Sequence, residues 1–297
     1  MPGRCARTMP PARKALLQIH LCVVIWGFTA VLGKLISLPA FALVWWRMCL
    51  VVAALALIPA FWRGLRQMSS RMIGIFAGIG VIVALHWVTF YGAIKLANAS
   101  VAATCMGVAP IMMSIVEPWI TRRRFDPREL LIGVAAVPGV MLVVGGTPEG
   151  MRLGIAVGVL SALLVSVFGA LNKRFVERGE PMAVTGLELA AGTAFLTLLA
   201  LLFGGEAMQL PLPGVRDGVL LLVLALACTL LPFALSLVAL RNLSAFSAQL
   251  AVSLEPVYAV FLAMLLLNEQ RELGMQFYAG LAIILGSVFA HAALKRV

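Results

Sequence analysis

Apolar segments of about twenty residues follow one another along almost the whole chain, separated by short polar turns. An α-helix needs roughly 20 apolar residues to cross the hydrocarbon core of a bilayer. Ten such segments use most of the 297 residues, so a large domain outside the membrane does not fit. The predicted spans are 15–36, 39–61, 72–94, 100–120, 129–147, 152–172, 182–204, 215–240, 245–267 and 274–294.

The composition places these segments in lipid. Hydrophobic residues make up 62% of the chain and charged residues 12%, whereas soluble domains carry about 25% charged residues. So few charges could not cover a water-exposed surface, and lipid removes that requirement. The segments are continuous apolar runs, not the alternating ten-residue segments of a membrane β-barrel. We therefore predict an all-α integral membrane protein with ten transmembrane helices.

Lysine and arginine are distributed unevenly between the turns, which predicts the orientation. With the N-terminus in the cytoplasm, 17 of them fall on the cytoplasmic side and 5 on the opposite side, and Arg47 lies within a span. This bias predicts both termini in the cytoplasm, with residues 1–14 as a tail, in a plasma membrane such as the bacterial inner membrane. The net charge of +11 comes from these short basic clusters, so we expect no nucleic-acid partner.

The two halves of the chain carry related patterns. The matching pairs are Lys95 with Arg241 and Pro110 with Pro256 at a shift of 146 residues, and Lys34 with Lys173 at a shift of 139. We therefore divide the chain into a first five-helix repeat, 15–147, and a second, 148–297. Because five is odd, the second repeat is inverted across the membrane. Many secondary transporters share this design and bind their substrate near the midplane between the repeats.

Two stretches resemble the repeats of EamA-type transporters, which belong to the drug/metabolite transporter superfamily. The first runs from Leu85 to Lys95 and precedes a span that contains proline, and the second runs from Ser253 to Glu269. The resemblance covers nearly the whole chain. It implies a five-plus-five inverted repeat around a central cavity, and export or exchange of amino acids, other metabolites or drugs.

The chain departs from the family pattern at one position. The acidic residue that the resemblance places at the end of the fourth span, opposite Glu269, is Arg123 in this sequence. Glu117 lies earlier in that span and is expected to pair with the arginines that follow it. Glu269 therefore has no acidic counterpart at the matching position.

Charged residues within the spans are candidates for function, because a charge at a helix centre costs at least ~2.5 kcal/mol on insertion scales. Glu255, near the middle of the ninth span, could bind a substrate amine, carry a proton or pair with a basic residue. Arg47, in the second span, could meet a substrate carboxylate or serve as a structural partner of Glu255. Glu188 occupies the repeat position of Arg47 and is expected to sit closer to the end of its span.

Four aromatic or imidazole side chains share one side of the third span: His86, Trp87, Phe90 and Tyr91. His86 and Tyr91 add a polar imidazole and a hydroxyl. Such a wall suits an amphipathic metabolite, although aromatic residues in spans also serve helix packing. In the ninth span, two polar residues one turn apart could bind substrate or a neighbouring helix. The predicted substrate-binding residues are Trp26, Arg47, His86, Trp87, Tyr91, Gln249, Ser253 and Glu255.

Pro110 and Pro256 are predicted to kink the fourth and ninth spans at the cavity. A proline inside a helix lacks an N–H and displaces the carbonyl four residues earlier, here those of Met106 and Val252. In lipid a freed carbonyl is costly unless it faces protein, water or substrate. The alternative is that both prolines make packing kinks only.

Glycines four residues apart are predicted to let helices pack closely. Two such pairs occur, Gly74 with Gly78 and Gly154 with Gly158. Both pairs are interpreted as packing contacts.

These features predict a secondary or facilitative carrier, an exporter of small metabolites such as amino acids, without a cofactor or metal. The chain has no Gly-rich phosphate loop with Lys-Ser/Thr, which argues against an ATP-driven pump. An intramembrane enzyme acting on lipid or peptide would need a nucleophile–base set or paired acids, and no such motif is present. A non-transporting scaffold would need a sizeable soluble surface. Lipid is the expected surrounding, and the sequence does not indicate an oligomeric state.

We expect cysteines introduced at 63–71 and 122–128 to react only with reagents that reach the cytoplasm, and cysteines at 204–214 to react from outside. The charge bias between the turns is the physical reason. Accessibility labelling in whole cells measures this. Labelling of 63–71 from outside would overturn the ten-span topology.

Overall fold

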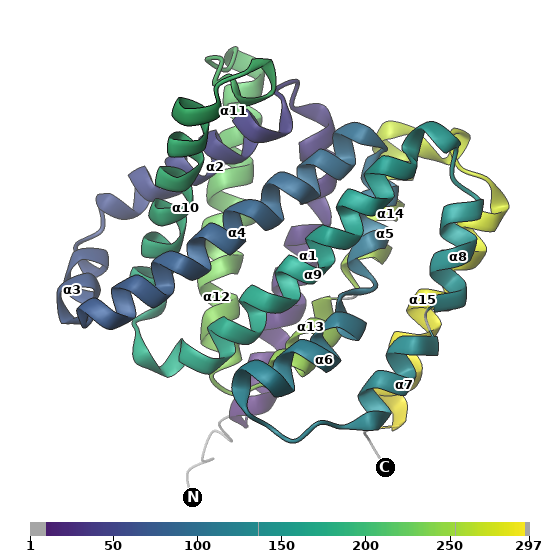
Figure 1. Ribbon diagram of the computed structural model, residues 1–297, viewed down its shortest axis with the longest axis horizontal. Coiled ribbons are helices and arrows are strands. Elements are labelled where there is room, and N and C mark those ends of the chain that lie inside the picture. Colours follow the sequence, from purple (N-terminus) through teal and green to yellow (C-terminus); the bar gives the residue numbers. More distant parts are fainter. Residues whose placement is uncertain (1–9, 136, 253, 295–297) are drawn as a thin grey trace, which may run out of the picture.

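A computed structural model describes residues 10–135, 137–252 and 254–294 (Figure 1). The regular structure of these residues is entirely helical. The α-helices are α1 Pro11–Leu35, α2 Ala40–Ala56, α3 Pro59–Gln67, α4 Ser70–Leu96, α5 Ala99–Met106, α6 Ala109–Thr121, α7 Pro127–Ala135, α8 Val137–Gly145, α9 Arg152–Phe175, α10 Pro181–Phe203, α11 Val215–Ala225, α12 Leu231–Leu240, α13 Ala245–Val252, α14 Glu255–Leu267 and α15 Met275–Leu294. The short turns are η1 Glu149–Met151, η2 Val176–Arg178, η3 Glu206–Met208, η4 Leu226–Leu230 and η5 Glu269–Arg271.

Seven helical stretches among the described residues are long and apolar enough to cross a membrane, or eight if the bent pair α2 and α3 is one span. The predicted fifth segment is described as α7 and α8, on either side of residue 136, which lies outside the described residues. The tenth contributes a shorter apolar helix within α15. This content is that of an integral membrane protein.

The second predicted span ends earlier than the sequence indicated. The α2 helix stops at Ala56, and α3 leaves at 91° to it. Pro59 opens α3, where its missing N–H and fixed φ favour a helix start over a continuation. The bend carries Arg63 and Arg66 on α3 away from the apolar segment, and both are exposed.

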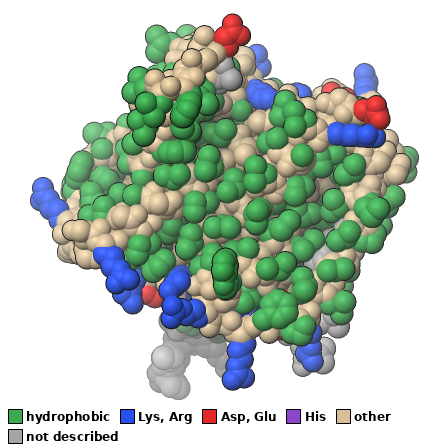
Figure 2. All heavy atoms as spheres, viewed as in Figure 1, with side chains coloured by type: hydrophobic (Ala, Val, Ile, Leu, Met, Phe, Trp, Pro, Cys, Tyr) green, Lys and Arg blue, Asp and Glu red, His purple; other side chains and the backbone are tan. Residues whose placement is uncertain are grey.

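The outer surface is apolar over the height of the bundle. Figure 2 shows hydrophobic side chains across the middle of the visible face and Lys and Arg side chains along its margins. Large apolar side chains are strongly exposed, such as Trp119 at 87% and Leu201 at 79%. A soluble monomer rarely exposes so continuous an apolar surface, whereas lipid covers it. The start of α1 and the end of α15 lie at the same edge of the bundle (Figure 1).

The two halves of the chain interlock. The α1 helix packs on α12 and α14 of the second half, α4 packs on α9 and α10, and α8 pairs with α15 (Figure 1). Residues matched in sequence also make matched contacts. Lys95 donates to the carbonyl of Ile36, and Arg241 donates to the carbonyl of Gly179. Any central site is therefore built from both halves.

The glycine pairs fall into two different environments. A methyl group on Gly154 would lie 2.7 Å from the Ala97 side chain, and one on Gly158 would lie 2.9 Å from Cys105. These two glycines let α9 approach α4 and α5. Gly74 and Gly78 have nothing within 4 Å of such a methyl group and are exposed on α4. The packing interpretation was therefore wrong for this pair, whose small side chains face outward.

Gly158→Leu should destabilise the protein, because added bulk in a close-packed interface costs about 1–3 kcal/mol. Gly78→Leu is the matched control, since it makes the same change on an open helix face. Thermal unfolding of purified protein in detergent measures both. Equal melting temperatures for the two variants would contradict the packing assigned to Gly158.

Candidate functional site: a central cavity between the two halves

Two helical stretches are broken near their middles, next to the matched prolines. The α5 helix ends at Met106 and α6 begins at Ala109, and α13 and α14 are separated in the same way. Pro110 and Pro256 occupy the first turns of α6 and α14, where a missing N–H is tolerated. Met106 and Val252, which end the two preceding helices, both line the central cavity.

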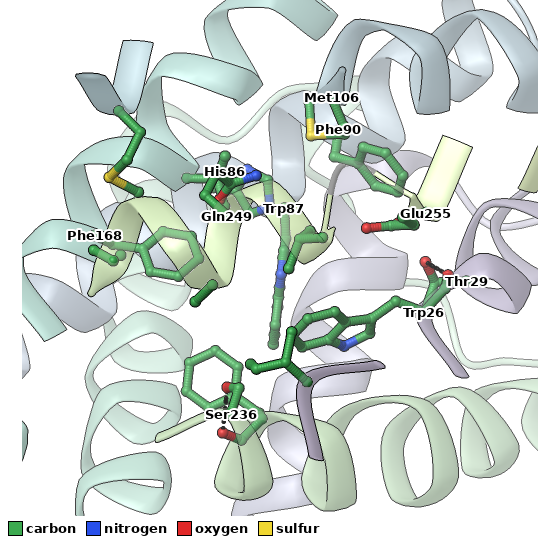
Figure 3. A pocket seen from close by; sticks show the side chains of 18 of the residues that line it. Trp26, Thr29, His86, Trp87, Phe90, Met106, Phe168, Ser236, Gln249 and Glu255 are labelled. Carbon is green, nitrogen blue, oxygen red and sulfur yellow. Dashed lines mark hydrogen bonds between the residues drawn. The ribbon is translucent and has the colours of Figure 1, made fainter. Parts of the chain in front are cut away.

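The cavity has a volume of about 130 Å³ and is walled mainly by apolar and aromatic side chains (Figure 3). A cavity of ~150 Å³ holds a benzene molecule in an engineered protein, so this chamber suits a small ligand. The lining residues are Ile19, Trp26, Thr29, Arg47, His86, Trp87, Phe90, Met106, Met113, Val165, Phe168, Gly169, Phe233, Ser236, Leu240, Ala245, Ala248, Gln249, Val252 and Glu255.

Arg47 is held by three neighbours and keeps one nitrogen toward the cavity. Its Nε donates to the Thr229 hydroxyl at 2.5 Å, and its Nη1 donates to the Tyr91 hydroxyl at 2.8 Å. The guanidinium carbon lies 3.9 Å from the centre of the Trp87 ring, a cation–π contact. Nη2 has no hydrogen-bond partner among the described residues. The guanidinium is therefore fixed in orientation, with donors left for a ligand.

Thr229 reaches Arg47 because the eighth predicted span is locally widened. Residues Leu226–Leu230 form a π-turn between α11 and α12, and the Thr229 hydroxyl also donates to the Leu224 carbonyl five residues earlier. Such widened turns occur often at functional sites. No sequence signal pointed to Thr229.

His86 faces α9 on one side and the cavity on the other. Its Nδ1 lies 2.9 Å from both the carbonyl and the hydroxyl of Ser161. The ring lies 5.3 Å from that of Phe168 and 6.3 Å from that of Phe90. Nε2 has no partner in the described chain, so it is the nitrogen open to a ligand.

Glu255 lies on the side of the cavity opposite His86, next to Trp26 and Thr29 (Figure 3). It is 8% exposed and makes no hydrogen bond or ion pair with another described residue. In particular, it forms no ion pair with Arg47, although both line the same chamber. The cavity therefore holds one carboxylate and one guanidinium that are not paired with each other.

The remaining predicted residues are placed as follows. Trp26, Trp87 and Gln249 line the cavity. Tyr91 is fully buried behind Arg47 and is not part of the lining, so its position suits holding the guanidinium. Ser253 lies outside the described residues.

Several lining residues that were not predicted lie at repeat positions of predicted ones. Shifting Trp87 and Phe90 by 146 residues gives Phe233 and Ser236, and shifting Trp26 by 139 gives Val165. The same shift takes Thr29 to Phe168. Thr29 itself is three residues from Trp26, on the same helix face. The two halves thus contribute equivalent positions to one chamber.

Two buried glutamates fasten the broken spans at their outer ends. The Glu269 carboxylate accepts hydrogen bonds from the backbone N–H groups of Ala99 and Ser100, at 3.0 and 2.8 Å. The Glu117 carboxylate does the same for Ala245 and Phe246, at 2.9 and 2.8 Å. Ala99 and Ala245 differ by 146 residues and open matching helices, so each half caps a helix of the other. Anions at helix N-termini are stabilised by the free N–H groups and the helix dipole.

Glu117 and Glu269 therefore have equivalent capping roles, although they do not occupy matching positions in the sequence. Arg122 and Asn268, again 146 residues apart, both adopt a left-handed conformation at φ 59° and 57°. Arg123 is thus the positional counterpart of Glu269, and Glu117 takes over the capping role from an earlier turn. Arg123 contacts Glu117 at 3.2 Å, as expected from sequence, and also Glu129. Partial burial lowers the pKa of Arg123, but Glu129 and Glu117 outweigh this effect and raise it above its ordinary value.

A bundle of membrane helices in two matched sets, enclosing a small charged and aromatic chamber, is the architecture of a membrane transporter. The chain belongs to the EamA-like transporter family, whose profile matches residues 13–145 and again residues 152–291. The protein is therefore an integral membrane transporter with two copies of the family repeat.

Two further comparisons agree with this assignment. A protein of Bacillus subtilis (strain 168) named uncharacterized transporter YyaM is 23% identical over 200 residues, which are 62% of this chain and 66% of that protein. The crystal structure of another protein matches with a TM-score of 0.70 at 17% identity, over 96% of this chain and 99% of its own. That likeness concerns the fold.

Glu269→Gln should lower stability by about 1–3 kcal/mol, because the buried N–H groups at the start of α5 lose a charged acceptor. Glu117→Gln should act similarly at α13. Thermal unfolding in detergent measures the loss, with exposed Glu206→Gln as the control. Wild-type stability in both capping variants would contradict their role in fastening the broken spans.

Proposed function

We propose that this transporter is a ten-span carrier with a five-plus-five inverted repeat and both termini in the cytoplasm. The matched contacts of Lys95 and Arg241, and the reciprocal capping by Glu117 and Glu269, support the repeat. The charge bias between turns supports the orientation. A plasma membrane, such as a bacterial inner membrane, is the proposed location.

The proposed substrate is a small zwitterion with an apolar side chain, with amino acids as the first candidates. The observation that carries this proposal is the separation of Arg47 and Glu255 within one chamber, without an ion pair between them. Unpaired charges at membrane depth are expensive. A substrate carboxylate at Arg47 and a substrate ammonium at Glu255 would compensate both, while Trp26, Trp87 and Phe168 receive the apolar part.

The shape of the cavity supports a state that is loaded from the cytoplasm. The α13 residues that line the chamber extend from Val252 to the first residue of the helix, Ala245. Ala245 lies at the cytoplasmic end in the proposed topology. Its counterpart Ala99 does not line the chamber. An exporter would bind substrate in this state and release it after the two repeats exchange their arrangements.

Glu255→Gln should reduce apparent affinity for the substrate at every pH, because the carboxylate that binds the ammonium is lost. A charge-assisted hydrogen bond contributes about 1.5–3 kcal/mol, or roughly ten- to a hundredfold in affinity. Arg47→Gln should weaken carboxylate binding similarly. Counterflow of a panel of labelled amino acids in proteoliposomes identifies the substrate and measures both effects.

Exposed Glu149→Gln is the matched control, since it removes a carboxylate far from the cavity surface. If Glu255 instead carries a coupled proton, its variant should keep exchange and lose accumulation driven by a pH gradient. Wild-type affinity and pH dependence in folded Glu255→Gln protein would overturn the site.

A further inference from the structure

A pair of polar side chains, Asn172 on α9 and Glu188 on α10, is buried away from the cavity. Glu188 is 0% exposed and Asn172 is 2% exposed. Asn172 Nδ2 donates to Glu188 Oε2 at 3.4 Å. Neither residue lines the central chamber. Glu188 lies seven residues into the 23-residue helix α10, about 10 Å from the helix start at 1.5 Å per residue, nearer to that end than to the other.

The two side chains carry complementary unsatisfied atoms. Glu188 Oε1 and Asn172 Oδ1 are both buried, and neither has a hydrogen-bond partner among the described residues. In an ionised pair both atoms are acceptors, so neither can satisfy the other. A proton on Oε1 makes that oxygen a donor. A carboxylic acid and a primary amide can then form two parallel hydrogen bonds, one in each direction.

Helix packing around Glu188 supplies no compensating cation. The α4 helix approaches so closely that a methyl group on Gly80 would lie 2.0 Å from the Glu188 carbonyl oxygen. Only Asn172 interacts with the Glu188 carboxyl among the described polar groups. An isolated carboxylate in such surroundings is strongly disfavoured.

The charged and titratable groups on the helices around this pair are directed elsewhere. On α2 and α4, Arg47 contacts Thr229 and Tyr91, and His86 contacts Ser161. Three further cations bind backbone carbonyls: Lys95 that of Ile36, Lys173 that of Leu240 and Arg174 that of Ile120. Cys49 borders a groove with Thr193 and Thr197, and the remaining groups are exposed: Arg63, Arg66, Arg71 and Glu180.

We propose that Glu188 and Asn172 form a proton-binding site, occupied by one proton in the state described here. Release breaks the O–H bond at Oε1 and sends the proton to water on the cytoplasmic side. It leaves a carboxylate on Glu188 and an unpaired Oδ1 on Asn172, so the link between α9 and α10 weakens. Asn172 lies one turn beyond Phe168 and Gly169, which line the chamber. The proton therefore acts on a helix of the substrate site, a consequence that rests on the proposed transport function.

Infrared spectroscopy tests proton binding without any substrate. At neutral pH the wild-type protein should show the C=O band of a protonated, hydrogen-bonded carboxylic acid, and Glu188→Gln should lack it. This variant should still fold, because a glutamine amide can make both bonds to Asn172. Glu149→Gln is the control and should keep the band. Absence of a Glu188 band in the wild type would overturn the proposal.

A pH titration of the wild-type band shows whether the proton exchanges. The band should disappear as the pH rises, whereas persistence to the highest pH at which the protein stays folded would overturn an exchangeable site. Over the pH range in which the band disappears, backbone hydrogen–deuterium exchange of residues 165–172, corrected for its intrinsic pH dependence, should accelerate in the wild type and not in Glu188→Gln. Unchanged exchange of these residues in the wild type would overturn the link to α9.

Thermal unfolding in sodium and potassium chloride separates a proton from a metal cation. Thr185, three residues before Glu188 on α10, has a hydroxyl oxygen that also lacks a partner among the described residues, so sodium is the cation to test. Equal stability in the two salts is expected for a proton site. Stabilisation specific to sodium, and lost in Glu188→Gln, would overturn the proposal. None of these readouts depends on the identity of the transported substrate.

Discussion

The satisfaction of backbone polar groups in a medium without water is the constraint on which the structure depends. Each unsatisfied N–H or C=O in hydrocarbon costs several kcal/mol. Interrupting two membrane helices near the bilayer midplane therefore requires compensation. At the breaks, turn hydrogen bonds supply part of it, from the Gly107 N–H to the Thr104 carbonyl and from the Leu254 N–H to the Ala251 carbonyl. At the outer end of each broken span, a buried carboxylate from the other half, Glu117 or Glu269, caps the first backbone N–H groups. The breaks in turn open the space at Met106 and Val252 that becomes the cavity.

The same constraint explains how the charged residues are used. Arg47 is kept from lipid by Thr229, Tyr91 and the face of Trp87. Glu255 has no such support and faces the chamber. A fixed cation and an unsupported anion on different halves make the chamber sensitive to the relative positions of the two repeats. Because a buried charge is costly without a partner, a substrate that bridges both groups would favour the state in which they are correctly spaced.

Glu188 illustrates a third solution to the cost of burial. It is surrounded by close helix packing and has an amide as its neighbour in place of a cation or a cavity. In the proposed inverted repeat its counterpart is Arg47, so the two matching positions would carry a supported cation and an isolated carboxyl. Under that proposal, the two halves share one frame and differ in its chemistry.

The apolar segments and their lengths determined the membrane class, the helical structure and the positions of most helices, because lipid imposes a simple rule on composition and span length. The matched prolines marked where two spans break, and the shift of 146 residues related Trp87 to Phe233. The partners of these residues followed only from packing between segments distant in sequence. Glu117 could replace the acid expected at Arg123 because α6 packs against α13 and places the Glu117 carboxylate at the first N–H groups of that helix, where Arg123 contacts it. Likewise, Gly154 and Gly74 belong to identical sequence patterns, yet one lies against Ala97 and the other faces outward. A pattern specifies which face of a helix is small or polar, and the tertiary arrangement specifies what that face meets.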